Sequence, residues 1–171
     1  MNFEEGYLYH VYNRGNNKCK IFFNRDNYLF FLRKFHSNVI PYADILAWCL
    51  MPTHFHLMIY VRSNEISERK EKLNSSIGKI LSSYTRAIQK QENFTGSLFQ
   101  KHTKSPCLNN NDVITPNYFN NAFGSLINTD LLCPNYLNAC FEYIHLNPVM
   151  DKLVSKPEDW EFSSYRDYFA G

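Results

Sequence analysis

Two histidines, His54 and His56, have the type and spacing most suited to chemistry in this chain. They are separated by one bulky apolar residue and open the apolar run 54–61, which follows a Met-Pro-Thr turn. Alternate side chains of a strand share a face, so the two imidazoles would stand about 7 Å apart while Phe55 points into a core. This arrangement predicts a metal site. The spacing also leaves open two structural histidines, each with a polar partner in the core.

A second set of candidate residues lies in the run Glu-Tyr-Ile-His-Leu-Asn-Pro-Val at 142–149. Tyr143 and Asn147 are four residues apart, so a helix would present them on one face. A tyrosine hydroxyl beside a metal-bound phosphate is a competent nucleophile, although a phenol with a pKa of about 10 needs the metal's help at neutral pH. Spacing alone does not favour Tyr143 over Tyr84 or Tyr136. An ordinary amphipathic helix with a buried tyrosine is the alternative.

The net charge of +2 conceals a local excess of basic residues. Between positions 61 and 105 there are nine basic and four acidic residues, a difference of five. Such an excess suits a phosphate backbone, whereas a solvated helix with ion pairs such as Glu68–Lys72 explains it equally well. Lys101 and Lys104 lie beyond the predicted helix, where the ion-pair explanation is weaker.

Composition indicates one globular domain spanning residues 1–171. The chain is 44% hydrophobic and 16% aromatic, which favours a packed core, and no apolar run approaches the ~20 residues that cross a bilayer. Its five cysteines form no Cys-x-x-Cys pair, and the first residues do not have the pattern of a secretory leader. We therefore expect a reduced, cytoplasmic setting with neither a disulfide framework nor a zinc ribbon.

The elements that would position these residues follow a repeated strand and helix pattern. Asn24 has the residue type of a helix cap, and the tight turn at 52–53 predicts an antiparallel hairpin. The order β-α-β-β-α-β is that of a ferredoxin-like antiparallel sheet with both helices on one face. The predicted elements are strand 7–13, helix 24–38, strands 44–51 and 54–61, helix 67–90 and a strand region at 96–108.

The remainder of the chain departs from that pattern. Residues 109–133 are predicted to form a surface insertion with a short helix around 117–126. A last helix is expected from Pro134 until Pro148 stops it, because proline suits a first helical turn and disfavours helix in the residue before it. The aromatic tail, 157–169, is expected to pack back on the domain.

Five blocks of this sequence together resemble the REP-associated tyrosine transposases, which belong with the single-tyrosine transposases of the HUH superfamily. The blocks occur in the same order and cover nearly the whole chain. They are Tyr-His-Val-Tyr-Asn-Arg-Gly-Asn at 9–16, Met-Pro-Thr-His-Phe-His at 51–56, Gly-Ser-Leu-Phe-Gln-Lys at 96–101, Tyr-Ile-His-Leu-Asn-Pro-Val at 143–149 and Trp-Glu-Phe-Ser-Ser-Tyr at 160–165.

The resemblance implies a fold and an activity. The fold would be α+β, a ferredoxin-like or RRM-like antiparallel sheet with an additional C-terminal helix that carries the catalytic tyrosine. The activity would be metal-dependent cleavage and strand transfer of single-stranded DNA through a 5′-phosphotyrosine, as in DNA transposition and recombination. A divalent ion, Mg²⁺ or Mn²⁺, would be held by His54, His56 and Asn147 in an open cleft, with Tyr143 as nucleophile.

The expected partner is single-stranded or hairpin DNA, and no membrane. Four residues are predicted to contact it: Asn13, Arg14, Lys101 and Lys104. The resemblance leaves a homodimer open, because some members complete each site with a partner's tyrosine helix. The long segment 109–133 would either extend the DNA-binding face or displace Tyr143.

Two other functions stay open at this point. A domesticated module that binds nucleic acid without cleaving it would have the same sheet. A histidine-triad nucleotide hydrolase fits poorly, because Met58 occupies the position of a third alternating histidine.

Overall fold

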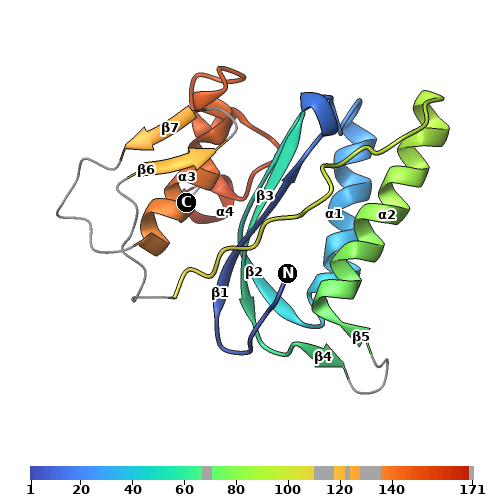
Figure 1. Cartoon of the computed structure of the whole chain (residues 1–171). Coiled ribbons are helices and arrows are strands. Elements are labelled where there is room, and N and C mark those ends of the chain that lie inside the picture. Colours follow the sequence, from blue (N-terminus) through green and yellow to red (C-terminus); the bar gives the residue numbers. More distant parts are fainter. Residues whose placement is uncertain (67–70, 110–117, 122–123, 128–135, 170–171) are drawn as a thin grey trace.

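Three strands form the central sheet of the computed structural model, which describes residues 1–66, 71–109, 118–121, 124–127 and 136–169. They are β1 (Leu8–Arg14), β2 (Ala43–Met51) and β3 (His54–Val61). Their order is β1-β3-β2 and both pairings are antiparallel, so β3 is the middle strand (Figure 1). The turn at 52–53 joins β2 to β3, as the sequence predicts.

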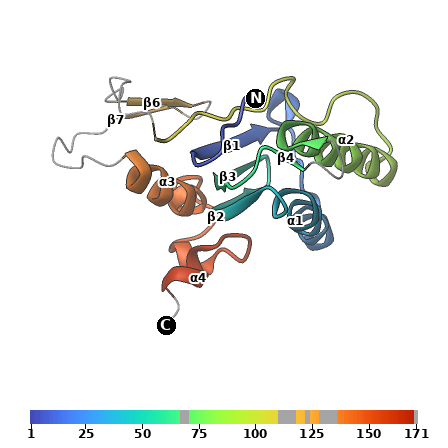
Figure 2. The same ribbon diagram turned by 90° about the horizontal axis from the view of Figure 1, so that it is seen from below.

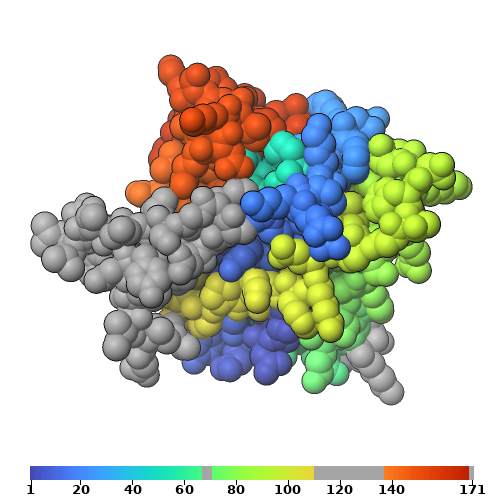
Figure 3. Space-filling view, turned by 45° about the horizontal axis from the view of Figure 1, so that its top comes forward, coloured from blue at the N-terminus to red at the C-terminus, as the bar shows by residue number. Residues whose placement is uncertain are grey.

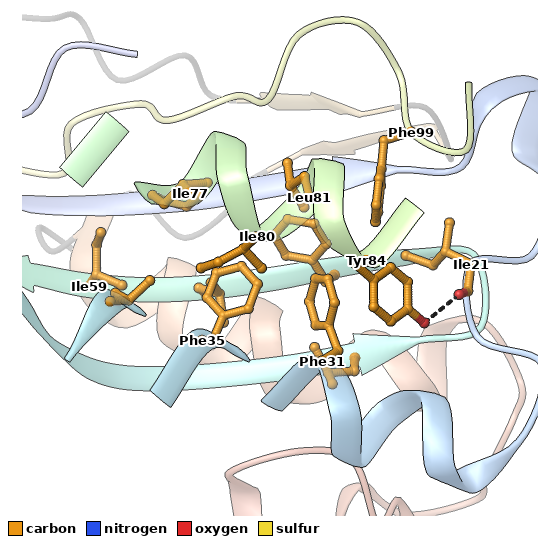
Figure 4. Packing of buried hydrophobic residues seen from close by; sticks show 14 of the residues in the cluster. Ile21, Phe31, Phe35, Ile59, Ile77, Ile80, Leu81, Tyr84 and Phe99 are labelled. Atoms are coloured by element: carbon orange, nitrogen blue, oxygen red, sulfur yellow. Dashed lines mark hydrogen bonds between the residues drawn. The ribbon is translucent and has the colours of Figure 1, made fainter. Parts of the chain in front are cut away.

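Two helices cover one face of this sheet. α1 (Arg25–Val39) begins with a capping box, in which the Asn24 side chain accepts from the Asn27 backbone and the Asn27 side chain accepts in return. α2 (Leu73–Glu92) lies beside α1 (Figure 2). The apolar stripe of α2 is buried in the core that both helices share with the sheet. Figure 4 shows the resulting core, where Phe31 of α1 and Tyr84 of α2 meet over the sheet.

The predicted start of the second helix at 67 is wrong, because α2 begins at Leu73. Before it, β4 (Glu65–Ile66) pairs antiparallel with β5 (Glu71–Lys72). This pairing holds Lys72 in an extended conformation, so the helix cannot begin earlier. Ser67 and Glu68, and with them the predicted Glu68–Lys72 ion pair, lie outside the described residues.

The predicted fourth strand at 96–108 forms only isolated bridges to β1. The bridges pair Tyr9 with Cys107, Tyr12 with Lys104 and Gly15 with Phe99. Three positions separate Tyr12 from Gly15, but five separate Phe99 from Lys104, so two extra residues interrupt the ladder as a bulge does. The segment still runs beside β1, at the sheet edge where a ferredoxin-like fold has its fourth strand.

The opposite face of the sheet is covered by C-terminal elements, chiefly α3 (Tyr136–Met150) (Figure 2). The prediction that Pro148 stops this helix is wrong, since it runs two residues further. Proline removes only one amide donor, and Asp151 N still donates to the Asn147 carbonyl at 2.9 Å. The predicted helix start at Pro134 lies outside the described residues.

A β-hairpin, and not a helix, occupies the described part of the segment 109–133. β6 (Tyr118–Asn121) and β7 (Gly124–Ile127) pair antiparallel, so the helix predicted around 117–126 is wrong. Both strands contain residue types that favour strands, such as Tyr118, Phe119 and Ile127.

The aromatic tail packs back in part. After the short helix η2 (Pro157–Asp159), the Trp160 indole donates to the Leu50 carbonyl at 3.0 Å. Phe162 stacks on Tyr28 of α1 at 3.9 Å between ring centroids. In α4 (Tyr165–Phe169), however, the last residue remains 59% exposed. Within the described residues, no helix is long and apolar enough to cross a bilayer.

Gly15, at the end of β1, provides a test of this packing. After Gly15 the chain turns through η1 (Asn16–Lys18), which brings Cys19 close to it. A Cβ on Gly15 would lie 2.1 Å from the Cys19 carbonyl oxygen. We predict that Gly15→Ala lowers the free energy of unfolding by about 1–3 kcal/mol, as overpacking does. Gly78→Ala is the control: a Cβ there meets nothing within 4 Å in α2 and should stabilise by about 0.5–1 kcal/mol. Urea unfolding measures both, and equal stabilities would contradict the close approach.

Candidate active site

The middle strand β3 is buried on both faces, and this decides the surroundings of the two histidines. Phe55 points into the core under α1 and α2, whereas His54 and His56 point toward α3. They are only 2% and 4% exposed, so the predicted open cleft is wrong. The cause is α3, whose Ile144 packs against the β2 residues beside them and closes that face.

His56 has one satisfied ring nitrogen and one bare ring nitrogen. Its Nδ1 lies 2.9 Å from Nε2 of His10 on β1, and the two rings stack at 5.0 Å between centroids. Its Nε2 is buried, and no polar group of the described chain lies within hydrogen-bonding distance. A buried imidazole nitrogen of this kind is suited to a ligand that the protein itself does not supply.

His54 lies beside the amide of Asn147, the third ligand that the family resemblance implies. Its Nε2 is 3.4 Å from Asn147 Oδ1, and its Nδ1 is 3.0 Å from the Thr53 hydroxyl. The Asn147 Nδ2 donates to the Tyr143 carbonyl at 2.8 Å, one helical turn earlier. That bond fixes the amide orientation and turns its oxygen toward His54.

Burial keeps these histidines neutral. Desolvation lowers the pKa of His54 to about 4 and that of His10 to about 3. The pKa of His56 is also well below its ordinary value, first through burial and then through the neighbouring His10 and His54. Neutral imidazole is the form that coordinates a metal, so all three rings are in that form at pH 7.

Tyr143 lies next to the histidine pair within the same chain. Its half-buried ring stands edge-on to His56, with 5.4 Å between centroids and 81° between ring planes. Tyr84, the alternative in the sequence, lies on the far side of the sheet and donates its hydroxyl to the Ile21 carbonyl at 2.7 Å (Figure 4). Tyr136 is the first residue of α3, two turns before Tyr143.

The structure adds two residues that the sequence did not suggest, His10 and Tyr12. The Tyr12 ring lies 5.6 Å from His56 and 4.8 Å from His10 between centroids, so Tyr12 is a second tyrosine near the site. Its register partner on β3 is His56. Alternation along β1 was the signal that could have found both, since His10, Tyr12 and Arg14 share one face.

Arg14 and Asn13 differ although they are neighbours on β1. Arg14 pairs with His54 in the register and is 7% exposed, and its charge contributes to lowering the pKa of His54. The Asn13 amide donates to the Gln100 carbonyl and the Thr103 hydroxyl, at 3.2 and 2.9 Å. Arg14 therefore lies at the histidine site, whereas Asn13 ties β1 to the edge segment.

The two predicted DNA-binding lysines are exposed on that edge segment, which lies on the surface beside the N-terminal residues (Figure 3). Lys104 bridges to Tyr12, and residues paired across antiparallel strands share a face, so it lies on the histidine side. Lys101 lines a pocket of about 390 Å³ next to α2. Glu142, beside the candidate nucleophile, is exposed.

The donor set fits a divalent ion with open coordination positions. It comprises two imidazole nitrogens and one carboxamide oxygen, from His54, His56 and Asn147. In the described residues, no group of three or more His, Cys, Asp or Glu side chains is arranged to hold a metal. The amide oxygen is a harder donor than imidazole, and as a third ligand it would leave room for phosphate oxygens and water.

Comparison with known proteins supports the fold. No family model and no curated protein matches the sequence. A solved structure described as a REP-associated tyrosine transposase bound to a REP hairpin is similar, with a TM-score of 0.66 at 15% identity. The match covers 99% of this chain and 83% of that one. The predicted α+β fold with an antiparallel sheet is confirmed, and at this identity the likeness concerns the fold alone.

The lowered pKa values predict acid sensitivity of the metal-free protein. Below pH 6.5 the imidazoles of the unfolded chain bind protons, whereas in the folded chain the pKa is about 4 for His54 and about 3 for His10. The free energy of unfolding should therefore fall as the pH falls through this window, by up to about 1.4 kcal/mol per pH unit for each histidine.

Urea unfolding in a chelator at several pH values measures this slope. His56→Gln removes one of the titrating imidazoles. The free energy of unfolding should then change less with pH, by up to about 1.4 kcal/mol per pH unit. Identical slopes for the variant and the parent would show that His56 titrates normally in the folded chain.

Proposed function

We propose that this protein is a metal-dependent transferase of single-stranded DNA, with Tyr143 as its nucleophile. One observation carries the proposal: Tyr143 stands against His56, whose bare Nε2 shares a buried site with His54 and the Asn147 oxygen. A nucleophile beside an electrophile-binding site is the geometry that such a transfer requires. The fold neighbour, itself a transposase bound to a DNA hairpin, supports the same class of reaction.

The metal would be Mg²⁺ or Mn²⁺, held by His54, His56 and Asn147. When bound, such an ion polarises a phosphate and stabilises the charge on its leaving oxygen. Imidazole ligands alone favour zinc or nickel, while the amide and phosphate oxygens favour harder ions. Manganese accepts both kinds of ligand, so we expect it to be effective in an assay.

The protein residues have defined parts in the proposed reaction. The Tyr143 oxygen attacks the phosphorus, forming a 5′-phosphotyrosine as the bond to the 3′-oxygen breaks. The phenolic proton passes to solvent and the departing strand ends in a 3′-hydroxyl, which can later reverse the step because one phosphoester replaces another. The buried Arg14 beside His54 would offset phosphate charge.

The DNA would approach along the β1 edge, where Arg14, Lys101 and Lys104 supply positive charge and Asn13 braces the edge segment. Such contacts position a backbone, and exposed bases or the shape of a hairpin supply specificity. Because the histidines and Tyr143 come from one chain, the proposed site needs no helix from a partner subunit. The proposed role is DNA transposition or a related recombination in the cytoplasm.

The proposal predicts that Tyr143→Phe abolishes the covalent protein–DNA adduct with Mn²⁺ while DNA binding persists. Only a hydroxyl is lost, so folding should be nearly unchanged. Tyr12→Phe is the matched control, because it removes the same atom from the other tyrosine near His56 and should still form the adduct. Denaturing gels with end-labelled hairpin DNA measure adducts, and His54→Ala and His56→Ala should also give none.

An adduct that persists in Tyr143→Phe and disappears in Tyr12→Phe would assign the nucleophile to Tyr12. Shifted but intact DNA with the unaltered protein, at saturating Mn²⁺, would instead support the non-cleaving nucleic-acid-binding module. The nearly complete burial of the histidines is the observation that favours that second function.

The lysines give a separate prediction about binding. Lys101→Ala with Lys104→Ala should reduce the slope of log affinity against log salt by roughly 1.4, since each single-strand phosphate contact contributes about 0.7. Affinity should fall to a similar degree for many sequences, and cleavage at saturating DNA should change little. Lys18→Ala with Lys20→Ala, which lie before α1, is the control pair. An unchanged slope for Lys101 and Lys104 would place the DNA elsewhere.

A further inference from the structure

His10 on β1 is a buried polar residue that has no role in the proposed metal site. It is 8% exposed and lies diagonally across from His56, since its own register partner is Met58. Its Nε2 is 2.9 Å from His56 Nδ1, and the stacked rings are inclined by 28°. A buried histidine beside a candidate ligand, on a separate strand, is well placed to orient that ligand.

A hydrogen bond between two neutral imidazoles has two possible directions. If His10 donates, then His56 carries its proton on Nε2, and a buried N–H donor has no partner among the described residues. If His56 donates from Nδ1, its Nε2 presents a bare lone pair. Only the second arrangement lets His56 bind a metal without first losing a proton.

We infer that His10 is a positioning residue that accepts the Nδ1 proton of His56 and so holds the His56 Nε2 lone pair toward the metal. This inference rests on the proposed metal site and extends it to a residue on a neighbouring strand. The partner of a metal-binding histidine commonly sets its tautomer and ring orientation, and its loss costs about 10–100-fold in metal affinity.

On the other ligand, the Nδ1 of His54 lies 3.0 Å from the Thr53 hydroxyl, a group that can donate or accept. Thr53 lies in the β2–β3 turn, directly before His54, whereas His10 reaches the site only through the pairing of β1 with β3. The two ligands would thus be oriented by different elements. The register of β1 becomes part of the metal site.

The first test is the tautomer of His56 in the metal-free, nitrogen-15-labelled protein, measured by long-range proton–nitrogen NMR in a chelator. The expected result is a protonated Nδ1 and a bare Nε2. A proton on Nε2 would overturn the inference. This measurement uses the unaltered chain and so does not depend on whether a variant folds.

The second test is the affinity for Mn²⁺ alone, measured by calorimetry. His10→Leu removes the acceptor and should weaken binding by about 10–100-fold, whereas His10→Gln places an amide oxygen near the Nε2 position and should recover most of the affinity. The control is His145→Leu, which removes another buried histidine, one that bonds Ser164 at 2.8 Å and not His56. That control should bind Mn²⁺ within about twofold of the parent.

The outcomes separate this inference from the proposed function. Tight Mn²⁺ binding by the parent with unchanged affinity in His10→Leu would overturn the role of His10 and leave the metal site intact. Equal losses in His10→Leu and His145→Leu would assign the effect to packing and also overturn it. A parent that binds no Mn²⁺ would overturn the inference and the proposed function together.

Discussion

The site depends on the burial of the middle strand on both of its faces. β3 has α1 and α2 on one side and α3 on the other, so its alternating side chains enter two different interiors. One interior is an aromatic core centred on Phe55. The other contains His54 and His56, which must find polar partners because burial without them is costly. Those partners come from β1, from the β2–β3 turn and from α3, and together they define the candidate site.

The same packing would place the candidate metal ligands before any ion binds. Asn147 bonds the carbonyl of Tyr143 and directs its oxygen at His54, so one turn of α3 fixes both a candidate ligand and the candidate nucleophile. Rigid support of this kind keeps reacting groups in place. It also closes the site, because the histidines are almost fully buried.

Local signals predicted most of the fold, and tertiary packing decided what they missed. The strand that carries the two histidines and the Asn24 cap each depend on residues close together in the sequence, and both predictions are confirmed. The roles of His10 and Tyr12 near His56 depend on a register between strands more than 40 positions apart, which spacing within one segment does not encode. The burial of the site likewise depends on where α3 packs. In the edge segment at 96–108, two extra residues interrupt the regular pairing with β1, so no continuous strand forms there.

The proposed function requires that His54, His56 and the Asn147 oxygen hold a divalent ion beside Tyr143. Anomalous diffraction from crystals soaked in Mn²⁺ would locate that ion. We expect one strong peak within bonding distance of His54 Nε2 and His56 Nε2, with Asn147 Oδ1 as the third protein ligand and the Tyr143 ring next to it. No peak at saturating Mn²⁺, or a peak held by other residues, would overturn the proposed function.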